Sequence, residues 1–180
     1  MAREEIELKF HLADAAPVPA QLRRLGFRIT RSRRLERNWI LDTSDRRLLQ
    51  SGSLLRLRRS GDAWLLTVKG PRRPGALKRR REIETAVADG PACRTLLAAL
   101  GYSGVLEYRR YRTTWERPRQ PGEVVWDETP MGIYIEIEGT ARWVRRTARE
   151  LGLRVKDAEP RSYPALYAAW NGRNTREKKL

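Results

Sequence analysis

Pairs of glutamates separated by a single residue recur along the chain. In an extended strand, residues two apart lie on the same face, so each pair presents two carboxylates to one side of a sheet. Clustered carboxylate oxygens are the ligands that hard divalent cations such as Mg²⁺ and Mn²⁺ prefer. The pairs are Glu5 and Glu7, Glu82 and Glu84, and Glu136 and Glu138. These pairs are candidate metal ligands.

Basic residues show the same spacing. Arg56 precedes Arg58 by two positions, and Arg110 precedes Arg112 in the same way. A guanidinium group donates paired hydrogen bonds to phosphate oxygens, while a lysine binds phosphate as a point charge. Lys9 continues the alternation of the first glutamate pair. If these acids and bases face one cavity, they predict a site for a metal–polyphosphate complex.

The elements that must carry these residues are strands, because apolar and charged residues alternate with a period of two. In the first run, Ile6, Leu8 and Phe10 oppose the charged residues. The expected strands cover residues 5–10, 27–41, 54–59, 63–69, 78–87, 105–115, 123–127 and 133–138. Short helices are expected over 17–25, 91–100, 140–151 and 163–170.

About eight strands with few helices predict an α+β fold, a closed eight-stranded antiparallel β-barrel with peripheral helices. Solvent exposure would explain each charged face singly. The matched chemistry of the faces favours another arrangement, in which helices cover an apolar outside and the charges line the lumen. Since unpaired charge is costly to bury, such a lumen must hold water, ions and a charged ligand. A single domain over 1–171 and a polar, disordered tail over 172–180 are expected.

The composition is that of a small, strongly basic globular protein. Its 180 residues include 38 Lys and Arg against 22 Asp and Glu, a formal net charge of +16 that favours polyanionic ligands. Cys93 is the single cysteine, which excludes an intramolecular disulfide and a cysteine-based zinc site. Without an apolar leader or a membrane-spanning run, a cytoplasmic monomer or homodimer with no membrane partner is expected. The basic runs follow strand periodicity and no RNA-binding motif is evident, so nucleic acid is not the expected partner.

The order of these motifs resembles the CYTH family, the triphosphate tunnel metalloenzymes. The opening residues 5–9 (Glu-Ile-Glu-Leu-Lys) look like the family's E-x-E-x-K signature, and residues 80–84 (Arg-Arg-Glu-Ile-Glu) are similar to its R-x-E-x-E element. Similar family elements lie at 41–43, 52–58, 67–70, 110–112, 127, 132–138 and 162–163. The resemblance covers Glu4 to Trp170, nearly the whole chain.

Some departures from the family pattern bear on substrate preference. Arg110 stands where lysine is more usual, and Trp39 and Trp115 stand where tyrosine or phenylalanine is more familiar. Relatives that act as adenylate cyclases open with a His-Phe type motif, whereas this chain has Glu5 there, which favours hydrolysis.

The resemblance implies a role for each charged residue. The implied ligands of Mg²⁺ or Mn²⁺ are Glu5, Glu7, Glu136 and Glu138, with Glu82, Glu84 and Asp127 as further ligands or water-orienting groups. Simple salt bridges to lumen arginines are the open alternative for Asp127 and Glu82. The implied triphosphate-binding residues are Lys9, Arg56, Arg58, Lys69, Arg80, Arg110 and Arg112. Lys9 is also a catalytic candidate beside Glu5 and Glu7, because with a shifted pKa it could help to activate water instead of only holding phosphate.

The expected function is divalent-metal-dependent hydrolysis of a triphosphate, with inorganic tripolyphosphate as the favoured substrate. Thiamine triphosphatase, nucleoside triphosphatase and adenylate cyclase-type activities are the alternatives that use the same cavity. A non-catalytic module that binds polyphosphate or RNA is the alternative from another class. The lumen carboxylates separate these classes, because a simple polyanion-binding module would not place glutamate pairs among its phosphate-binding residues.

Overall fold

A computed structural model describes residues 2–177 of the chain. Its strands are β1 (Ala2–Leu12), β2 (Arg28–Asp42), β3 (Leu54–Ser60), β4 (Ala63–Lys69), β5 (Lys78–Val87), β6 (Ser103–Glu116), β7 (Gly122–Thr129) and β8 (Gly132–Gly139). Its helices are α1 (Val18–Arg24), α2 (Arg47–Gln50), α3 (Gly90–Ala99), α4 (Ala141–Glu150) and α5 (Tyr163–Glu177), with a 3₁₀ turn η1 over Val155–Asp157.

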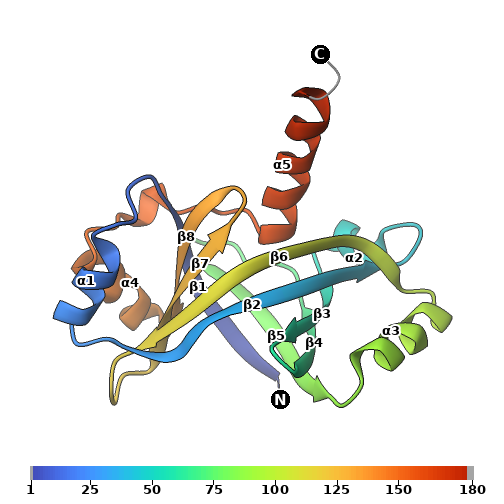
Figure 1. Ribbon diagram of the computed structural model, residues 1–180, viewed down its shortest axis with the longest axis horizontal. Helices are drawn as coiled ribbons and strands as arrows, with labels where there is room; N and C mark the ends of the chain where they lie inside the picture. The colour runs from blue at the N-terminus through green and yellow to red at the C-terminus, as the bar shows by residue number, and fades with distance from the viewer. Residues whose placement is uncertain (1, 178–180) are drawn as a thin grey trace.

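The strands close into one antiparallel barrel in the order β1-β5-β4-β3-β2-β6-β7-β8 (Figure 1). Strand β1 completes the closure because it pairs with β5 on one side and with β8 on the other. Glu7 lies in register with Lys78 of β5 and with Glu138 of β8. The predicted closed eight-stranded barrel with peripheral helices is confirmed.

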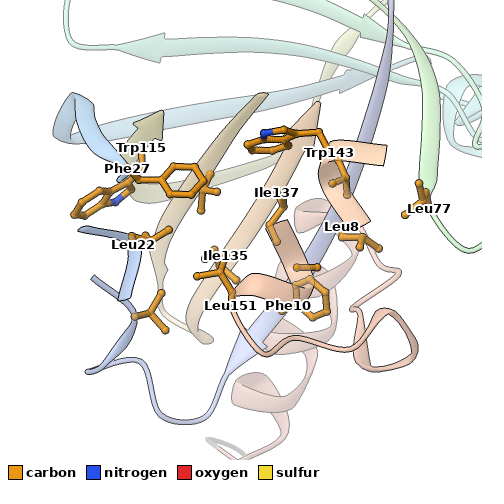
Figure 2. Close-up of a cluster of buried hydrophobic side chains, with 14 residues drawn as sticks. Leu8, Phe10, Leu22, Phe27, Leu77, Trp115, Ile135, Ile137, Trp143 and Leu151 are labelled. Atoms are coloured by element: carbon orange, nitrogen blue, oxygen red, sulfur yellow. The ribbon is translucent and has the colours of Figure 1, made fainter. Parts of the chain in front are cut away.

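The outward face of β1, β7 and β8 is apolar and lies beneath helices α1 and α4. Leu8 and Phe10 of β1 pack with Ile135 and Ile137 of β8 and with Val144 of α4, and all are almost fully buried. Figure 2 shows this cluster, to which α1 also contributes. Full burial of such a side chain stabilises the fold by about 1.5–3 kcal/mol. Because the apolar faces turn outward to the helices, the alternate, charged faces turn into the barrel.

A second apolar cluster lies under α3, on the side of the barrel away from α1 and α4 (Figure 1). Trp39 and Leu41 of β2 and Leu55 and Leu57 of β3 form it, and Leu97 of α3 packs against them. Cys93 is unpaired and half-buried in the same cluster. This packing fixes the outward face of β2 and β3, so that the intervening residues of both strands face the lumen.

Helix α5 closes one end of the barrel. It does so through Tyr163, Leu166 and Tyr167, which pack against Ile40, Tyr108 and Tyr134. Each of the last three residues is separated by an even number of positions from a charged inward-facing residue of its strand (Glu36, Arg110 and Glu136), so all three face inward near this end. The remainder of α5 projects away from the barrel (Figure 1). The lumen therefore has one end covered by aromatic side chains.

The structure differs from the sequence-based expectation in its shortest elements and at the C-terminal end. Helix α2 and the turn η1 were not expected, because four and three residues are too few to show a helical period. Helix α5 continues past Trp170 to Glu177, so residues 172–177 of the expected disordered tail are helical instead. The segment has no proline, and one glycine inside a helix costs only about 1 kcal/mol. Residues 178–180 of that tail lie outside the described residues.

The helices found within residues 2–177 also bear on membrane insertion. None of them combines the length and the apolar character that a membrane crossing requires.

Candidate active site

The inward faces of the strands enclose a cavity of about 450 Å³ whose wall is largely ionic. The wall contains 11 basic and 8 acidic side chains, so it suits a polyanion that arrives with a counter-cation. The predicted site residues on this wall are Glu5, Glu7, Lys9, Arg56, Arg58, Lys69, Arg80, Glu82, Glu84, Arg110, Arg112, Glu136 and Glu138. Asp127, the remaining predicted residue, is fully buried and bonded to two of these arginines.

The two ends of the cavity differ in their exposure to solvent. Next to Tyr163 and helix α5, the side chains of Lys9 and Arg110 are only 1% and 2% exposed. Arg3 and Arg31 lie on the wall at the opposite strand ends, and their side chains are 59% and 57% exposed. The cavity is therefore open to solvent beside Arg3 and Arg31 and enclosed beside Lys9.

Glu5, Glu7 and Glu138 form a carboxylate cluster, with one oxygen from each lying within 4.8 Å of the others. Burial raises the pKa of Glu138 to about 8, and the negative charge of Glu5 adds to that rise. The Oε2 atom of Glu5 is buried and has no hydrogen-bond partner within residues 2–177. A free buried oxygen and a carboxyl group that resists ionisation are the properties of a site that a divalent cation would complete.

Two lysines border this carboxylate cluster. Lys69 Nζ lies 2.5 Å from Glu5 Oε1, and Lys78 Nζ pairs with Glu7 Oε1. Burial opposes the charge of Lys78, but the nearby glutamates, chiefly Glu7, outweigh it and raise the pKa of this lysine. Lys78 was not among the predicted site residues, although the strand alternation places it on the inward face of β5. Its position on the cavity wall could have been predicted from that alternation.

The two glutamates of β5, Glu82 and Glu84, form ion pairs with basic residues of the wall. Glu82 lies 3.2 Å from Lys69 Nζ, and Glu84 lies 3.2 Å from Arg58 and 3.6 Å from Arg56. Neither glutamate belongs to the carboxylate cluster. Salt bridging was left open for Glu82, whereas Glu84 was predicted only as a metal ligand, and the geometry of both acids supports salt bridging.

Asp127 anchors a buried network at the closed end. It accepts hydrogen bonds from Arg112 at 2.6 and 2.7 Å, from Arg110 at 3.2 Å and from the Tyr163 hydroxyl at 2.6 Å. Burial, reinforced by the Asp127 charge, raises the pKa of Tyr163 well above its usual range, so the phenol stays protonated and donates. Asp127 is thus not brought to the carboxylate cluster, and its oxygens serve to orient two arginines.

Glu36 is a member of this network that the sequence analysis missed. Its carboxylate lies 2.8 Å from Arg110, 3.4 Å from Arg58 and 3.9 Å from Arg112. Burial opposes its ionisation, but the three arginines hold the pKa of Glu36 far below its usual range. The irregular alternation before Trp39 hid this residue, since the first eight residues of β2 are exposed.

Lys9 lies at the closed end with its ammonium group almost fully enclosed. Its Nζ is 3.3 Å from Glu136, 3.2 Å from the Arg161 carbonyl oxygen and 3.8 Å from the centre of the Tyr163 ring. Burial lowers the pKa of Lys9, and the charge of Lys78 adds to this, although Glu136 opposes it. Glu136 also bonds Arg112 at 2.6 Å. Glu136 thus lies between two phosphate-binding candidates and outside the carboxylate cluster.

Some donors on the wall remain available to a ligand. Arg56, Arg58 and Arg80 each have a buried Nε with no hydrogen-bond partner in the described part of the chain. An unsatisfied buried donor is costly, and a phosphate oxygen would satisfy it with a strong charge-assisted hydrogen bond. These three arginines face the same cavity as the carboxylate cluster. The arrangement can therefore hold a phosphate chain between a basic wall and a cation site.

Comparison with known proteins places this arrangement in a family. The family model of the CYTH domain matches residues 3–163 of the chain. The chain belongs to the CYTH domain family. It is also 26% identical over 134 residues to a curated Methanocaldococcus jannaschii protein named "Putative adenylate cyclase MJ0240", covering 74% of this chain and 75% of that one.

Solved CYTH-like structures share the fold of this CYTH chain. A Vibrio parahaemolyticus protein described as "a putative adenylate cyclase" superposes with a TM-score of 0.81 at 22% identity, covering 93% of this chain and 99% of that one. PH1819 from Pyrococcus horikoshii OT3 gives a TM-score of 0.77 at 25% identity, covering 92% and 98%. HpAC1 from Hippeastrum, described as having a dominant triphosphatase activity, gives 0.70 at 17% identity, covering 92% and 95%.

Proposed function

We propose that this CYTH protein hydrolyses a linear triphosphate with the help of a divalent cation, and that inorganic tripolyphosphate is its substrate. The observation that carries the proposal is the carboxylate cluster of Glu5, Glu7 and Glu138 inside an otherwise basic cavity. A module that only bound polyanions would gain nothing from three mutually repelling carboxylates there. A phosphohydrolase needs them, because a cation must neutralise the phosphate charge that the arginines do not reach.

Glu5, Glu7 and Glu138 are the residues proposed to hold Mg²⁺ or Mn²⁺. All three offer oxygen donors, which these hard cations prefer, and Glu5 has one oxygen without a hydrogen-bond partner in the described chain. Tunnel enzymes of this family use divalent metals. When bound, such a cation polarises phosphate oxygens and lowers the pKa of a coordinated water.

The basic residues bind and orient the substrate. Arg56, Arg58 and Arg80 supply unpaired Nε–H donors on one side of the cavity, and Lys69 lies between the carboxylate cluster and Glu82. Arg110 and Arg112 are fixed by Asp127, so they present guanidinium groups to a phosphate without reorganisation.

Lys9 is proposed to act on the terminal phosphate at the closed end. Its position fits this role, because the Tyr163 ring and the Arg161 carbonyl oxygen enclose its ammonium group. Its lowered pKa makes proton transfer to a phosphate oxygen easier than it would be for a surface lysine. Because this end is enclosed, the low local dielectric strengthens the contact between the Lys9 ammonium group and the phosphate.

The substrate assignment follows from the chemistry of the wall. The aromatic residues on the cavity wall are Tyr108 and Tyr163, and both lie at the closed end. A base or a thiazolium ring would find no aromatic side chain to stack on among the described residues near the mouth, whereas phosphate oxygens meet charge along the whole wall. Inorganic tripolyphosphate is therefore proposed ahead of thiamine triphosphate and nucleoside triphosphates. Location in the cytoplasm and the oligomeric state stay predictions.

A phosphate-release assay tests the proposal. Purified protein is offered tripolyphosphate, thiamine triphosphate and ATP, each with Mg²⁺ or Mn²⁺ and with EDTA, and cyclic AMP is measured in the ATP arm because relatives carry a cyclase name. We expect metal-dependent phosphate release, fastest from tripolyphosphate, and its loss in Glu7→Gln and Glu138→Gln. The matched control is Glu4→Gln, because Glu4 lies on the same strand but is exposed and pairs with Arg73. Equal turnover in all three variants would rule out the catalytic assignment, and cyclic AMP as the main product would replace hydrolysis by cyclisation.

A further inference from the structure

Strand β2 is irregular at the open end of the cavity. From Ile29 to Arg34 it advances five residues, while the paired strand β6 advances three, from Trp115 to Arg112. The register shifts fall on both sides of Arg31. Extra residues in one strand re-aim the side chains that follow, and such bulges recur beside active sites.

The bulge brings two arginines to the same face. Arg31 and Arg34 are three residues apart, so strict alternation would send them to opposite faces of the barrel. Both nevertheless lie on the cavity wall. Their cross-strand partners, Thr114 and Arg112, lie on it as well. The irregular backbone therefore lets β2 place two arginines at the mouth, where a regular strand would place only one of them.

These two arginines differ in their availability to a ligand. Arg31 is held 2.8 Å from Glu123, which lies in register with Glu138 of the carboxylate cluster. The side chain of Arg34 is exposed and makes no hydrogen bond or ion pair with the described residues 2–177. Cross-strand neighbours lie roughly 5 Å apart, side by side around the barrel. The ion pair of Arg31 and Glu123 therefore borders the cation site. Arg34 lies beside Arg112 across the β2–β6 pair, and it precedes the buried Glu36 by two residues on β2, so it lies nearer to the open end.

We infer that Arg34, with Arg31 beside it, forms an additional anion subsite at the cavity mouth, which binds the phosphates of a linear inorganic polyphosphate beyond the third. This inference rests on the proposed function, because it extends the same binding path. The mouth offers charge and no aromatic side chain, so it favours a further phosphate over a nucleoside at this position. Chains longer than tripolyphosphate are then the substrates that use the whole cavity.

Chain-length dependence of KM tests the subsite. Wild type, Arg34→Gln and Arg34→Lys are assayed for phosphate release from tripolyphosphate, tetrapolyphosphate and ATP. The control is Arg145→Gln, which removes one charge from the exposed face of α4. We expect Arg34→Gln to raise the ratio of the KM for tetrapolyphosphate to that for tripolyphosphate by about fivefold, the order of one partly screened charge contact. Arg34→Lys should recover part of this change, and Arg145→Gln should leave the ratio as it is.

The outcomes separate the subsite from the proposed function. If wild type hydrolyses tripolyphosphate but Arg34→Gln leaves the ratio unchanged, the subsite is refuted and the function stands. An equal rise of the KM for ATP would also refute it, since the nucleoside has no phosphate to place there. If no substrate releases phosphate, the proposed function fails, and calorimetric titration with the same two polyphosphates decides the subsite. Tighter binding of tetrapolyphosphate that is lost in Arg34→Gln supports it, and equal binding overturns it.

Discussion

The hydroxyl of Tyr163 lies 2.6 Å from Oδ2 of Asp127, which joins helix α5 to the buried end of the cavity. The ring of the same tyrosine lies beneath Lys9 Nζ at 3.8 Å and beside the Arg110 guanidinium at 4.7 Å. The ring face of Tyr163 thus contacts two cationic groups. Its hydroxyl contacts Asp127, the carboxylate that orients Arg110. Tyr163 is therefore a positioning residue that couples the closure of the barrel to the arrangement of the phosphate-binding groups.

Tyr163→Phe is expected to lower kcat for tripolyphosphate by roughly tenfold while keeping the barrel folded. It removes one hydrogen bond to a charged acceptor, worth about 1.5–3 kcal/mol, and leaves the ring contacts in place. Asp127 then holds Arg110 and Arg112 less firmly, which costs transition-state stabilisation more than ground-state binding. Steady-state kinetics with tripolyphosphate measure this split. Tyr111→Phe, on the outer face of β6, is the control, and an unchanged kcat in Tyr163→Phe would show that the hydrogen bond is only structural.

Arg110→Met is expected to destabilise the protein by about 3–5 kcal/mol, the usual cost of removing one partner of a buried ion pair. Glu36 and Asp127 both bond this arginine, and each would lose one of the buried guanidinium groups that compensate its charge. The neighbouring Arg109 is exposed and meets Glu107 only at 3.6 Å, so Arg109→Met should cost less than about 1 kcal/mol. Urea unfolding of the two variants gives the comparison. Similar losses in both would mean that the network at the closed end contributes no more than a surface contact.

The metal-free protein is expected to lose stability as the pH rises from about 5 to about 8. The pKa of Glu138 is near 4.5 when it is unperturbed and about 8 in the folded chain, because of burial and the charges of Glu5 and Glu7. Between these values the folded state holds one proton more than the unfolded state, so loss of that proton favours unfolding. Each pKa unit of difference corresponds to about 1.4 kcal/mol.

Thermal unfolding in EDTA across this pH range measures the effect, with Glu138→Gln as the reference that lacks the titrating group. The wild-type Tm should fall toward pH 8 relative to that of the variant, and Mg²⁺ should abolish the difference by compensating the charge. Parallel pH profiles of the two proteins would contradict the placement of Glu138 in a repelling cluster.

Most of the features that could be predicted from the sequence lie in the regular strands. The alternation around Glu5, Glu7 and Lys9 gave both their common face and their strand, because a period of two needs only a few residues to show. The same alternation placed Arg56, Arg110 and their neighbours on the cavity wall. Pairing across strands was not visible in this way, since Glu138 meets Glu7 only through the closure of the barrel.

The residues that sequence analysis missed or assigned differently depend on long-range contacts or on irregular backbone. Asp127 was predicted as a further metal ligand, with salt bridges to arginines as the alternative, and two arginines and a tyrosine from another element take up its oxygens. Arg34 reaches the wall only because of the β2 bulge, and a bulge interrupts the period from which facing is inferred. Glu36 follows that same bulge, so its inward orientation could not be read from the residues before it.

Glu36→Gln is expected to lower the KM for tripolyphosphate by roughly tenfold while it lowers the stability of the free protein. The Glu36 carboxylate competes with a phosphate for Arg58 and Arg110. Removing its charge should therefore increase the affinity of both arginines for the phosphate. Tripolyphosphate should accordingly raise the Tm of the variant more than that of wild type, because a ligand that binds the folded state more tightly stabilises it more. Kinetics and thermal shifts are compared with Glu107→Gln, which alters an exposed acid on the outer face of β6. A higher KM in Glu36→Gln would show instead that Glu36 holds the arginines in the geometry that phosphate requires, and that its charge does not compete with the substrate.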